Sequence, residues 1–208
     1  MTDVSLRAVF EIALPLFLIM DPIGNAAMCL PMLSKYTPHQ QRRILLRELL
    51  IALGIIFLFH YLGEWLLGVL NIHQSTLRLS GGFILFLIAI KMVFPTTGEG
   101  LVDPDQEPFI VPIAIPFIAG PSLLAAVMLY AHRAQTTHPG MVGSPSVLLG
   151  IVAAWAATVI IMMSAPGLMR YLGNRGMRAA ERLMGLILVF LAVQMLEDGI
   201  KMFLTSLD

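Results

Sequence analysis

The sequence predicts an all-α integral membrane protein with six membrane-spanning helices. Of its 208 residues, 58% are apolar and only 12% are charged, and the mean hydropathy is +0.84. A soluble domain carries about 25% charged residues, so this composition indicates a chain that lies in a lipid bilayer. The apolar runs 51–59 and 83–90 do not alternate with polar residues, which argues against the strands of a membrane β-barrel.

Six apolar segments have the length of about 20 residues that a helix needs to cross the hydrocarbon core. We expect these helices at 8–33, 45–70, 76–94, 111–131, 146–168 and 180–203. The first residues have neither the basic run nor the short apolar core of a cleavable signal peptide, so segment 8–33 is predicted to remain as the first helix. Residues 1–208 are therefore expected to form a single transmembrane domain.

The basic residues predict the orientation, because Lys and Arg near helix ends gather on the cytoplasmic side. One set of helix ends carries nine of the thirteen: Lys35, Arg42, Arg43, Arg47, Lys91, Arg170, Arg175, Arg178 and Arg182. The opposite ends carry Arg7, Arg78, Arg133 and Lys201. We expect a multi-pass protein of a bacterial inner membrane with both termini in the periplasm.

Charge and cysteine content exclude several classes of function. Thirteen basic residues balance thirteen acidic ones, so no net positive field favours nucleic acid. Cys29 is the sole cysteine, and the five histidines have no metal-ligand spacing. We therefore predict no disulfide, no metal site and no cofactor.

An internal repeat divides the chain into two halves of three helices, 8–94 and 111–203. A shift of 99 residues pairs Ile19 with Ile118, Pro22 with Pro121, Ala26 with Ala125, Ala27 with Ala126 and Leu30 with Leu129. A shift of 104 pairs Arg78 with Arg182, Gly81 with Gly185 and Phe86 with Phe190. Because each half has an odd number of spans, the repeat would be inverted. Gly81, Gly82 and Gly185 are predicted to mark close packing of the third and sixth helices.

Helix-breaking sequences lie near the middle of the first and fourth segments: DPIGN at 21–25 and GPS at 120–122. Asp21 followed by Pro22 is typical of the cap and first turn of a new helix. A broken helix in hydrocarbon requires that its freed backbone groups line a polar cavity or lie buried in protein. An aspartate at the bilayer centre is disfavoured by about 2.5 to 3.5 kcal/mol, which marks Asp21 as a functional candidate. In the alternative interpretation, the prolines merely kink two helices, and neighbours satisfy Asp21 and Asn25.

Six motifs together resemble the MarC family of bacterial inner-membrane proteins, most closely its YhgN-like branch. They are LIMDPIGN (18–25), RELLIAL (47–53), SGG (80–82), LFLIAIKM (85–92), EPFIVP (107–112) and ERLMGLIL (181–188). The resemblance spans nearly the whole chain. It implies a distant relationship to LysE-type exporters, and some family members are classed as transporters of small neutral amino acids. Ser122 stands where many members have glycine after the Gly-Pro pair.

Two half-helix N-termini at one depth predict a site for a zwitterionic solute, because free N–H groups and positive dipole ends would point inward. We expect the substrate ammonium to bind at Asp21 and its carboxylate to bind the N–H groups around Ser122. The Asn25 side chain is expected to set the register of the substrate between them. The predicted substrate-binding residues are Asp21, Pro22, Gly24, Asn25, Gly120, Pro121 and Ser122. The small residues around them would also pack helices if nothing bound.

Three residues are candidates for coupling or gating: Asp21, Glu48 and Gln194. Asp21 is a candidate proton carrier as well as a ligand, and the sequence leaves the coupling ion, H⁺ or Na⁺, open. Glu48 is expected to form an ion pair with Arg47 at the inner interface, or otherwise to act as a cytoplasmic gate. Gln194 is expected to make hydrogen bonds between helices, or to line a path between the halves.

These observations predict a secondary transporter or exporter of small neutral amino acids, such as glycine or alanine, or of related solutes. The alternatives are a non-transporting membrane scaffold or regulator, an intramembrane enzyme, and a channel. No metalloprotease or serine-nucleophile motif occurs in a span, so we expect no catalytic residue and no enzyme. The expected partners are a zwitterionic small solute and the lipid bilayer, with a homo-oligomer left open and no nucleic acid.

Overall fold

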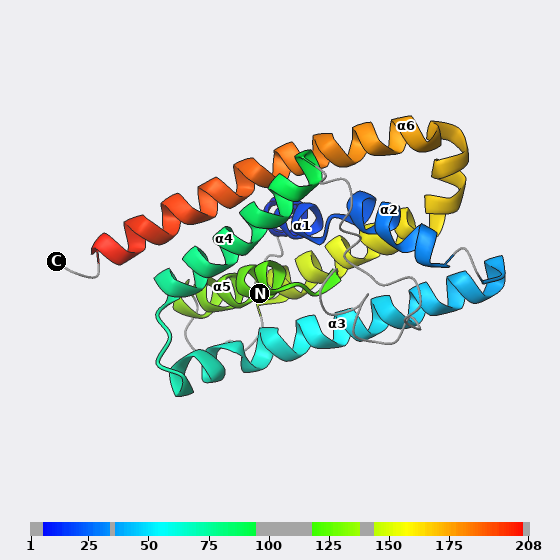
Figure 1. The fold of residues 1–208 in the computed structure, drawn as a ribbon. Helices are drawn as coiled ribbons and strands as arrows, with labels where there is room; N and C mark the ends of the chain where they lie inside the picture. The colour runs from blue at the N-terminus through cyan, green and yellow to red at the C-terminus, as the bar shows by residue number, and fades with distance from the viewer. Residues whose placement is uncertain (1–5, 34–35, 95–117, 138–143, 206–208) are drawn as a thin grey trace.

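The computed structural model describes residues 6–33, 36–94, 118–137 and 144–205, and these residues form helices and short connections with no strand. The helices are α1 (Leu6–Met20), α2 (Pro22–Leu33), α3 (Pro38–Val69), α4 (Gln74–Val93), α5 (Pro121–Thr137) and α6 (Pro145–Thr205). Figure 1 shows them packed in one bundle. Four stretches of the described residues are long and apolar enough to cross a membrane: Pro38–Gly63, Gln74–Val93, Pro145–Gly167 and Arg175–Thr205.

The predicted segments correspond to these helices with two differences. The first segment is divided into α1 and α2 at Asp21, and the second and third lie in α3 and α4. The fifth and sixth segments are joined in α6 instead of being separated by a loop. Of the fourth segment, residues 111–117 lie outside the described part of the chain.

A sharp bend divides α6 into a first limb (145–172) and a second limb (174–205). The backbone at Gly173 has φ 62° and ψ 176°, a combination that only glycine adopts readily. Figure 1 shows the second limb turning back along the bundle from this bend, which lies at the same end as the start of α3. Arg42 and Arg43 lie near the start of α3, and Arg175 and Arg178 follow the bend. We call this end of the molecule the basic end.

The start of α3 follows directly from its local sequence. Thr37 and Gln40 form a capping box, in which the Gln40 N–H donates to Thr37 Oγ1 (3.4 Å) and the Thr37 N–H donates to Gln40 Oε1 (3.0 Å). Pro38 occupies the first helical position, where its missing N–H leaves no bond unmade. The cap therefore fixes where this long helix begins at the basic end.

Glycines allow α4 and the second limb of α6 to pack closely in antiparallel directions. A Cβ at Gly82 would lie 3.1 Å from the carbonyl oxygen of Ala192, and one at Gly185 would lie 3.2 Å from the carbonyl oxygen of Ala89. The predicted close packing at Gly82 and Gly185 is confirmed. Gly81 instead packs mainly on α5, because a Cβ there would lie 2.8 Å from Ala125 Cβ.

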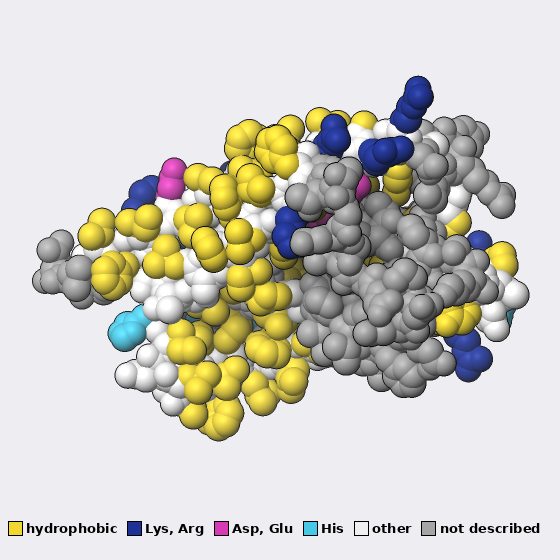
Figure 2. All heavy atoms as spheres, in the orientation of Figure 1, with side chains coloured by type: hydrophobic (Ala, Val, Ile, Leu, Met, Phe, Trp, Pro, Cys, Tyr) yellow, Lys and Arg dark blue, Asp and Glu magenta, His cyan; other side chains and the backbone are white. Residues whose placement is uncertain are grey.

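The largest cluster of buried side chains joins α1, α2, α3, α5 and the first limb of α6, and includes Leu16, Cys29, Leu49, Val127 and Ile151. The surface carries many exposed large apolar residues, among them Phe10, Trp65, Phe83, Ile160 and Phe190. Figure 2 shows apolar side chains covering much of the described surface in this view. A surface of this kind suits contact with lipid and not with water.

Candidate functional site

The break between α1 and α2 is organised by Asp21. Its backbone has φ 42°, a left-handed conformation that aspartate and asparagine adopt more readily than other side-chain-bearing residues. The Asp21 N–H still donates to the carbonyl of Leu18 (3.1 Å), whereas its Oδ1 accepts from the Gly24 N–H (3.1 Å). Pro22 is the first residue of α2 and needs no N–H partner. Asp21 therefore ends one helix and caps the next, as its sequence context predicts.

Asn25 completes the break from the other side. Its Nδ2 donates to the carbonyl oxygen of Met20 at 2.7 Å, which satisfies one of the carbonyls left without a partner at the end of α1. Asp21 and Asn25 are only 7% and 5% exposed. The two side chains thus satisfy backbone groups of both helix ends within a buried polar site.

Gly24 makes room for this arrangement. A Cβ at this position would lie 2.0 Å from Asp21 Oδ2 and 2.8 Å from Met92 Cε of α4. No side chain fits at these distances unless the carboxylate and Met92 both move. The absence of a side chain at Gly24 therefore lets the Asp21 carboxylate and α4 approach α2 together.

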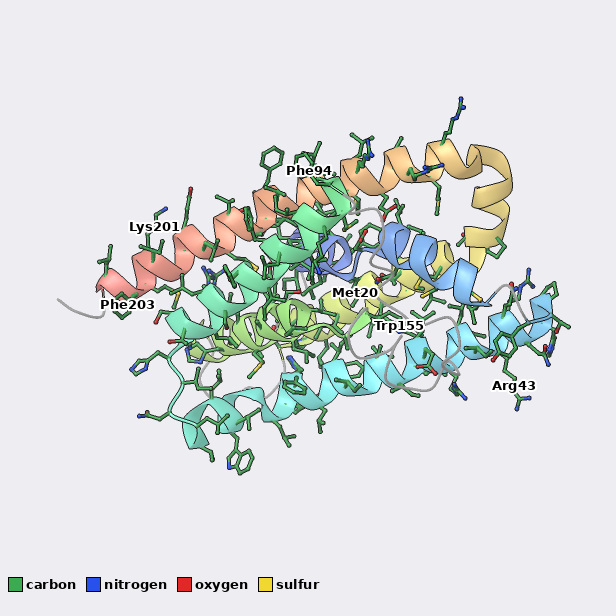
Figure 3. All side chains as sticks on the ribbon, in the orientation of Figure 1. Met20, Arg43, Phe94, Trp155, Lys201 and Phe203 are labelled. Carbon is green, nitrogen blue, oxygen red and sulfur yellow. The ribbon has the colours of Figure 1, made fainter. Side chains whose placement is uncertain are left out.

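Thr158 is a polar residue at this break that the sequence analysis did not single out. Its Oγ1 donates to Ala154 O (2.9 Å) and contacts Met20 Sδ (3.3 Å), and the side chain is wholly buried in the first limb of α6. Figure 3 labels Met20 in the interior of the bundle. The signal that could have identified it is a threonine within the otherwise apolar run 151–163.

The second predicted break coincides with the start of α5. Pro121 is the first residue of α5, and the Gly120 carbonyl accepts from the Leu124 N–H at 3.0 Å. Ser122 is buried, 3% exposed, and its Cα would lie 3.8 Å from a Cβ at Gly81 of α4. Met20 and Leu123 belong to the same cluster of buried side chains, so the end of α1 and the start of α5 share one core.

The Glu48 side chain is more buried than the sequence led us to expect, and the Gln194 side chain is more exposed. The predicted ion pair of Glu48 is confirmed, since Arg47 Nη2 lies 2.8 Å from Glu48 Oε1. The Glu48 side chain is however fully buried, 0% exposed, whereas that of Arg47 is half exposed. The side chain of Gln194 is exposed in the second limb, and its role between helices or between the halves stays a prediction.

An ion pair that sequence reasoning missed joins Arg78 of α4 to Asp198 of the second limb. The side chain of Arg78 is 5% exposed and that of Asp198 is 39% exposed. Nothing in the sequence pairs two residues that lie 120 positions apart, although an arginine within an apolar helix needs a partner. The pair lies toward the end of the bundle opposite the basic end.

The comparisons with known proteins identify a family of membrane proteins. Residues 6–204 match the model of the MarC family integral membrane proteins. The UPF0056 inner membrane protein YhgN of Escherichia coli (strain K12) is 43% identical over 202 residues, which cover 96% of this chain and 99% of that protein.

Other organisms carry relatives of similar length. A UPF0056 membrane protein of Buchnera aphidicola (subsp. Baizongia pistaciae) is 43% identical over 94% of this chain and 98% of its own. One from Pyrococcus abyssi is 27% identical over 89% of this chain and 90% of its own. No solved structure matches. The chain therefore belongs to the MarC family of integral membrane proteins.

Proposed function

We propose that this protein is a secondary transporter of small neutral amino acids or closely related zwitterions, working by alternating access. The observation that carries the proposal is the buried break at Asp21, where a carboxylate lies between two helix ends inside an apolar bundle. Such discontinuous helices are the usual substrate sites of secondary transporters. The proposal assigns no catalytic residue, cofactor or nucleic-acid partner.

The substrate ammonium binds at Asp21 in this proposal. One carboxylate oxygen of Asp21 accepts from the Gly24 N–H, and a carboxylate has about four lone-pair sites, so acceptor capacity is left for an ammonium. The substrate carboxylate binds at the N-terminus of α5, where the N–H groups around Ser122 and the helix dipole favour an anion. Asn25 and Gly24 line the site and favour a small side chain on the substrate.

The packing supports an arrangement of six helices as two inverted repeats. The antiparallel α4 and second limb are the third and sixth helices, and Gly81 and Gly185, equivalent under the shift of 104, both lie at close helix contacts. The first helix contacts the fifth, with Ile12 on Gly150, and the second contacts the fourth, with Met128 on Gly63. The basic end is then cytoplasmic and both termini are periplasmic.

Uptake of radiolabelled alanine and glycine into proteoliposomes tests the proposal. We expect saturable uptake by the wild-type protein and its loss in Asp21→Asn, because asparagine keeps the left-handed backbone and the cap but not the charge. Glu197→Gln, which removes an exposed carboxylate from the second limb, is the matched control and should transport normally. Full flux in Asp21→Asn would contradict the central site.

Thermal stability in detergent gives a second readout that needs no flux. Millimolar alanine, glycine or serine should raise the unfolding temperature of the wild type, because a ligand that binds only the folded state stabilises it. The rise should disappear in Asp21→Asn, whose unfolding temperature without ligand also reports whether the variant folds. No shift and no flux with any amino acid would favour a membrane scaffold or a different solute.

A further inference from the structure

Glu48 lies on the buried face of α3, in the part of the helix nearer the basic end. Leu45, Leu49, Ala52 and Ile56 recur on this face at the spacing of helical turns, and each is at most 3% exposed. Glu48 falls on the same stripe and is 0% exposed. Burial of a carboxylate at such a position costs several kcal/mol unless its charge is neutralised and its oxygens accept hydrogen bonds.

The two oxygens of Glu48 have different surroundings. Oε1 accepts from Arg47 Nε (3.0 Å) and Nη2 (2.8 Å), and the Arg47 side chain is half exposed. Oε2 is buried and has no hydrogen-bond partner among the residues that the structure describes. Glu48 thus presents one oxygen to a basic group that reaches solvent and one to the interior.

The buried face of α2 leads from the helix break toward Glu48. Asp21, Asn25 and Cys29 follow one another at intervals of four residues, which places them on one side of the helix over about 12 Å. All three are buried, with Cys29 only 1% exposed. Cys29 belongs to the same cluster of buried side chains as Leu45 and Leu49, which share the buried stripe of α3 with Glu48. Polar side chains therefore extend along α2 from Asp21 to the neighbourhood of Glu48.

We propose that Glu48 is the proton-binding site that couples this transporter, at the basic end of the polar face formed by Asp21, Asn25 and Cys29. A hydronium ion at the basic end transfers a proton to Oε2: one O–H bond of the hydronium ion breaks, an O–H bond on the carboxyl group forms, and water is left. The carboxyl group then lacks the charge that attracts Arg47. Release of the proton restores the ion pair. The inference rests on the proposed transport function, because coupling requires a transported solute.

The surroundings of Glu48 favour a proton over a sodium ion. Sodium sites in transporters gather several oxygens, commonly from unwound backbone, whereas Glu48 lies within the continuous helix α3. The charged and titratable neighbours that the described residues show are the Arg47 guanidinium on α3, which repels a metal cation, and the Cys29 thiol on α2. From α6, the Trp155 indole N–H donates to Leu49 O at 2.8 Å and does not reach the carboxylate.

Alanine uptake driven by a proton gradient is the first test. The measured quantity is the ratio of initial uptake with a gradient, acidic on the side of the basic end, to uptake without one. We expect a ratio several-fold different from one in wild-type proteoliposomes and in Glu197→Gln, and a ratio of one in Glu48→Gln. A gradient response that survives in Glu48→Gln, or is absent from a wild type that transports, overturns the proposal.

Infrared difference spectra of the purified protein between acid and alkaline buffer are the second test, which does not depend on transport. The wild type and Glu197→Gln should show in acid the carbonyl bands of protonated, buried carboxyl groups, and Glu48→Gln should lose one of them. Asp21→Asn, which removes the other buried carboxyl group among the described residues, identifies the band of Asp21. A folded Glu48→Gln variant that loses no band overturns the assignment. If the wild type transports no amino acid, the proposed function fails while the spectra still decide whether Glu48 binds a proton.

Discussion

The side chains of Asp21 and Asn25 cap opposite helix ends at the same break. Asp21 Oδ1 accepts from the start of α2, and Asn25 Nδ2 donates to the end of α1. Each satisfies a backbone group that would otherwise be unpaired in a low-dielectric interior. The break is therefore a stable structural unit, and its two polar side chains are already oriented before any solute arrives.

Gly24→Ala tests how tightly this unit is packed. Alanine normally favours a helix over glycine, but its Cβ would lie 2.0 Å from Asp21 Oδ2 and 2.8 Å from Met92 Cε. Displacing both groups should cost about 1 to 3 kcal/mol of stability, the range seen for overpacked cores. We expect a lower unfolding temperature in detergent and weaker binding of alanine.

Gly54→Ala is the matched control for this substitution. A Cβ at Gly54 in α3 would meet nothing within 4 Å. The helix propensity of alanine should then leave stability unchanged or raise it by up to about 1 kcal/mol. Equal behaviour of the two variants would show that the space around Gly24 is not restrictive.

Ser122→Ala and Gly120→Leu distinguish the contribution of the Ser122 hydroxyl to substrate binding from that of the backbone at the start of α5. If backbone N–H groups hold the substrate carboxylate, Ser122→Ala should raise the KM for alanine by about tenfold or less, the effect of losing about one hydrogen bond. Gly120 is buried, so leucine there should abolish uptake by blocking approach to the helix end. The KM and the maximal rate of alanine uptake are measured for both variants. A larger loss of uptake in Ser122→Ala than in Gly120→Leu would show that the hydroxyl, and not the backbone, binds the substrate carboxylate.

Much of the local structure follows from the sequence. Asp21 before Pro22 predicts both the end of α1 and the cap of α2, because these signals act within a few residues of the chain. The second helix was expected from position 45, where its apolar segment begins, but the capping box of Thr37 and Gln40 starts α3 earlier, at Pro38. The repeated glycines of the third and sixth segments correctly marked a close helix contact.

Other features depend on neighbours that the sequence does not name. Glu48 beside Arg47 resembled an interfacial pair, but its side chain is fully buried beside Leu45 and Leu49, which belong to the core shared with α2, α5 and the first limb of α6. Gln194 lies on the outer face of the second limb because the inner face is taken up by the contact with α4. The sharp bend at Gly173 was also unpredictable, because a single glycine with a positive φ joins two helical limbs where a loop was expected.

Removing one partner of the Arg78–Asp198 pair should destabilise the contact between α4 and the second limb. Asp198→Asn leaves a buried guanidinium without its counter-charge. The loss should fall below the about 3 to 5 kcal/mol of a wholly buried pair, because Asp198 is 39% exposed. The double variant Arg78→Met with Asp198→Asn should be more stable than Asp198→Asn alone, as measured by thermal unfolding.

The exposed pair Arg7–Glu11 in α1 is the control for this experiment. Its side chains are 87% and 62% exposed, so Glu11→Gln should change stability by less than about 1 kcal/mol. A double variant of Arg78 and Asp198 that is no more stable than Asp198→Asn would show that the lone guanidinium finds solvent, and that the pair does not hold the two helices together.

Cys29 is a natural probe of movement along α2, because it is the only cysteine in the chain. The thiol is 1% exposed, so a maleimide reaches it only when the packing around α2 opens locally. We expect Cys29 to label at least about tenfold more slowly than Thr76→Cys in a Cys29→Ser background, because Thr76 is exposed near the start of α4. Saturating alanine should change the rate at Cys29 and not at position 76, since a solute bound at Asp21 and Asn25 shifts the population of the open state. The same experiment on Asp21→Asn should show no effect of alanine. An equal rate at Cys29 with and without alanine in the wild type would mean that α2 does not move in transport.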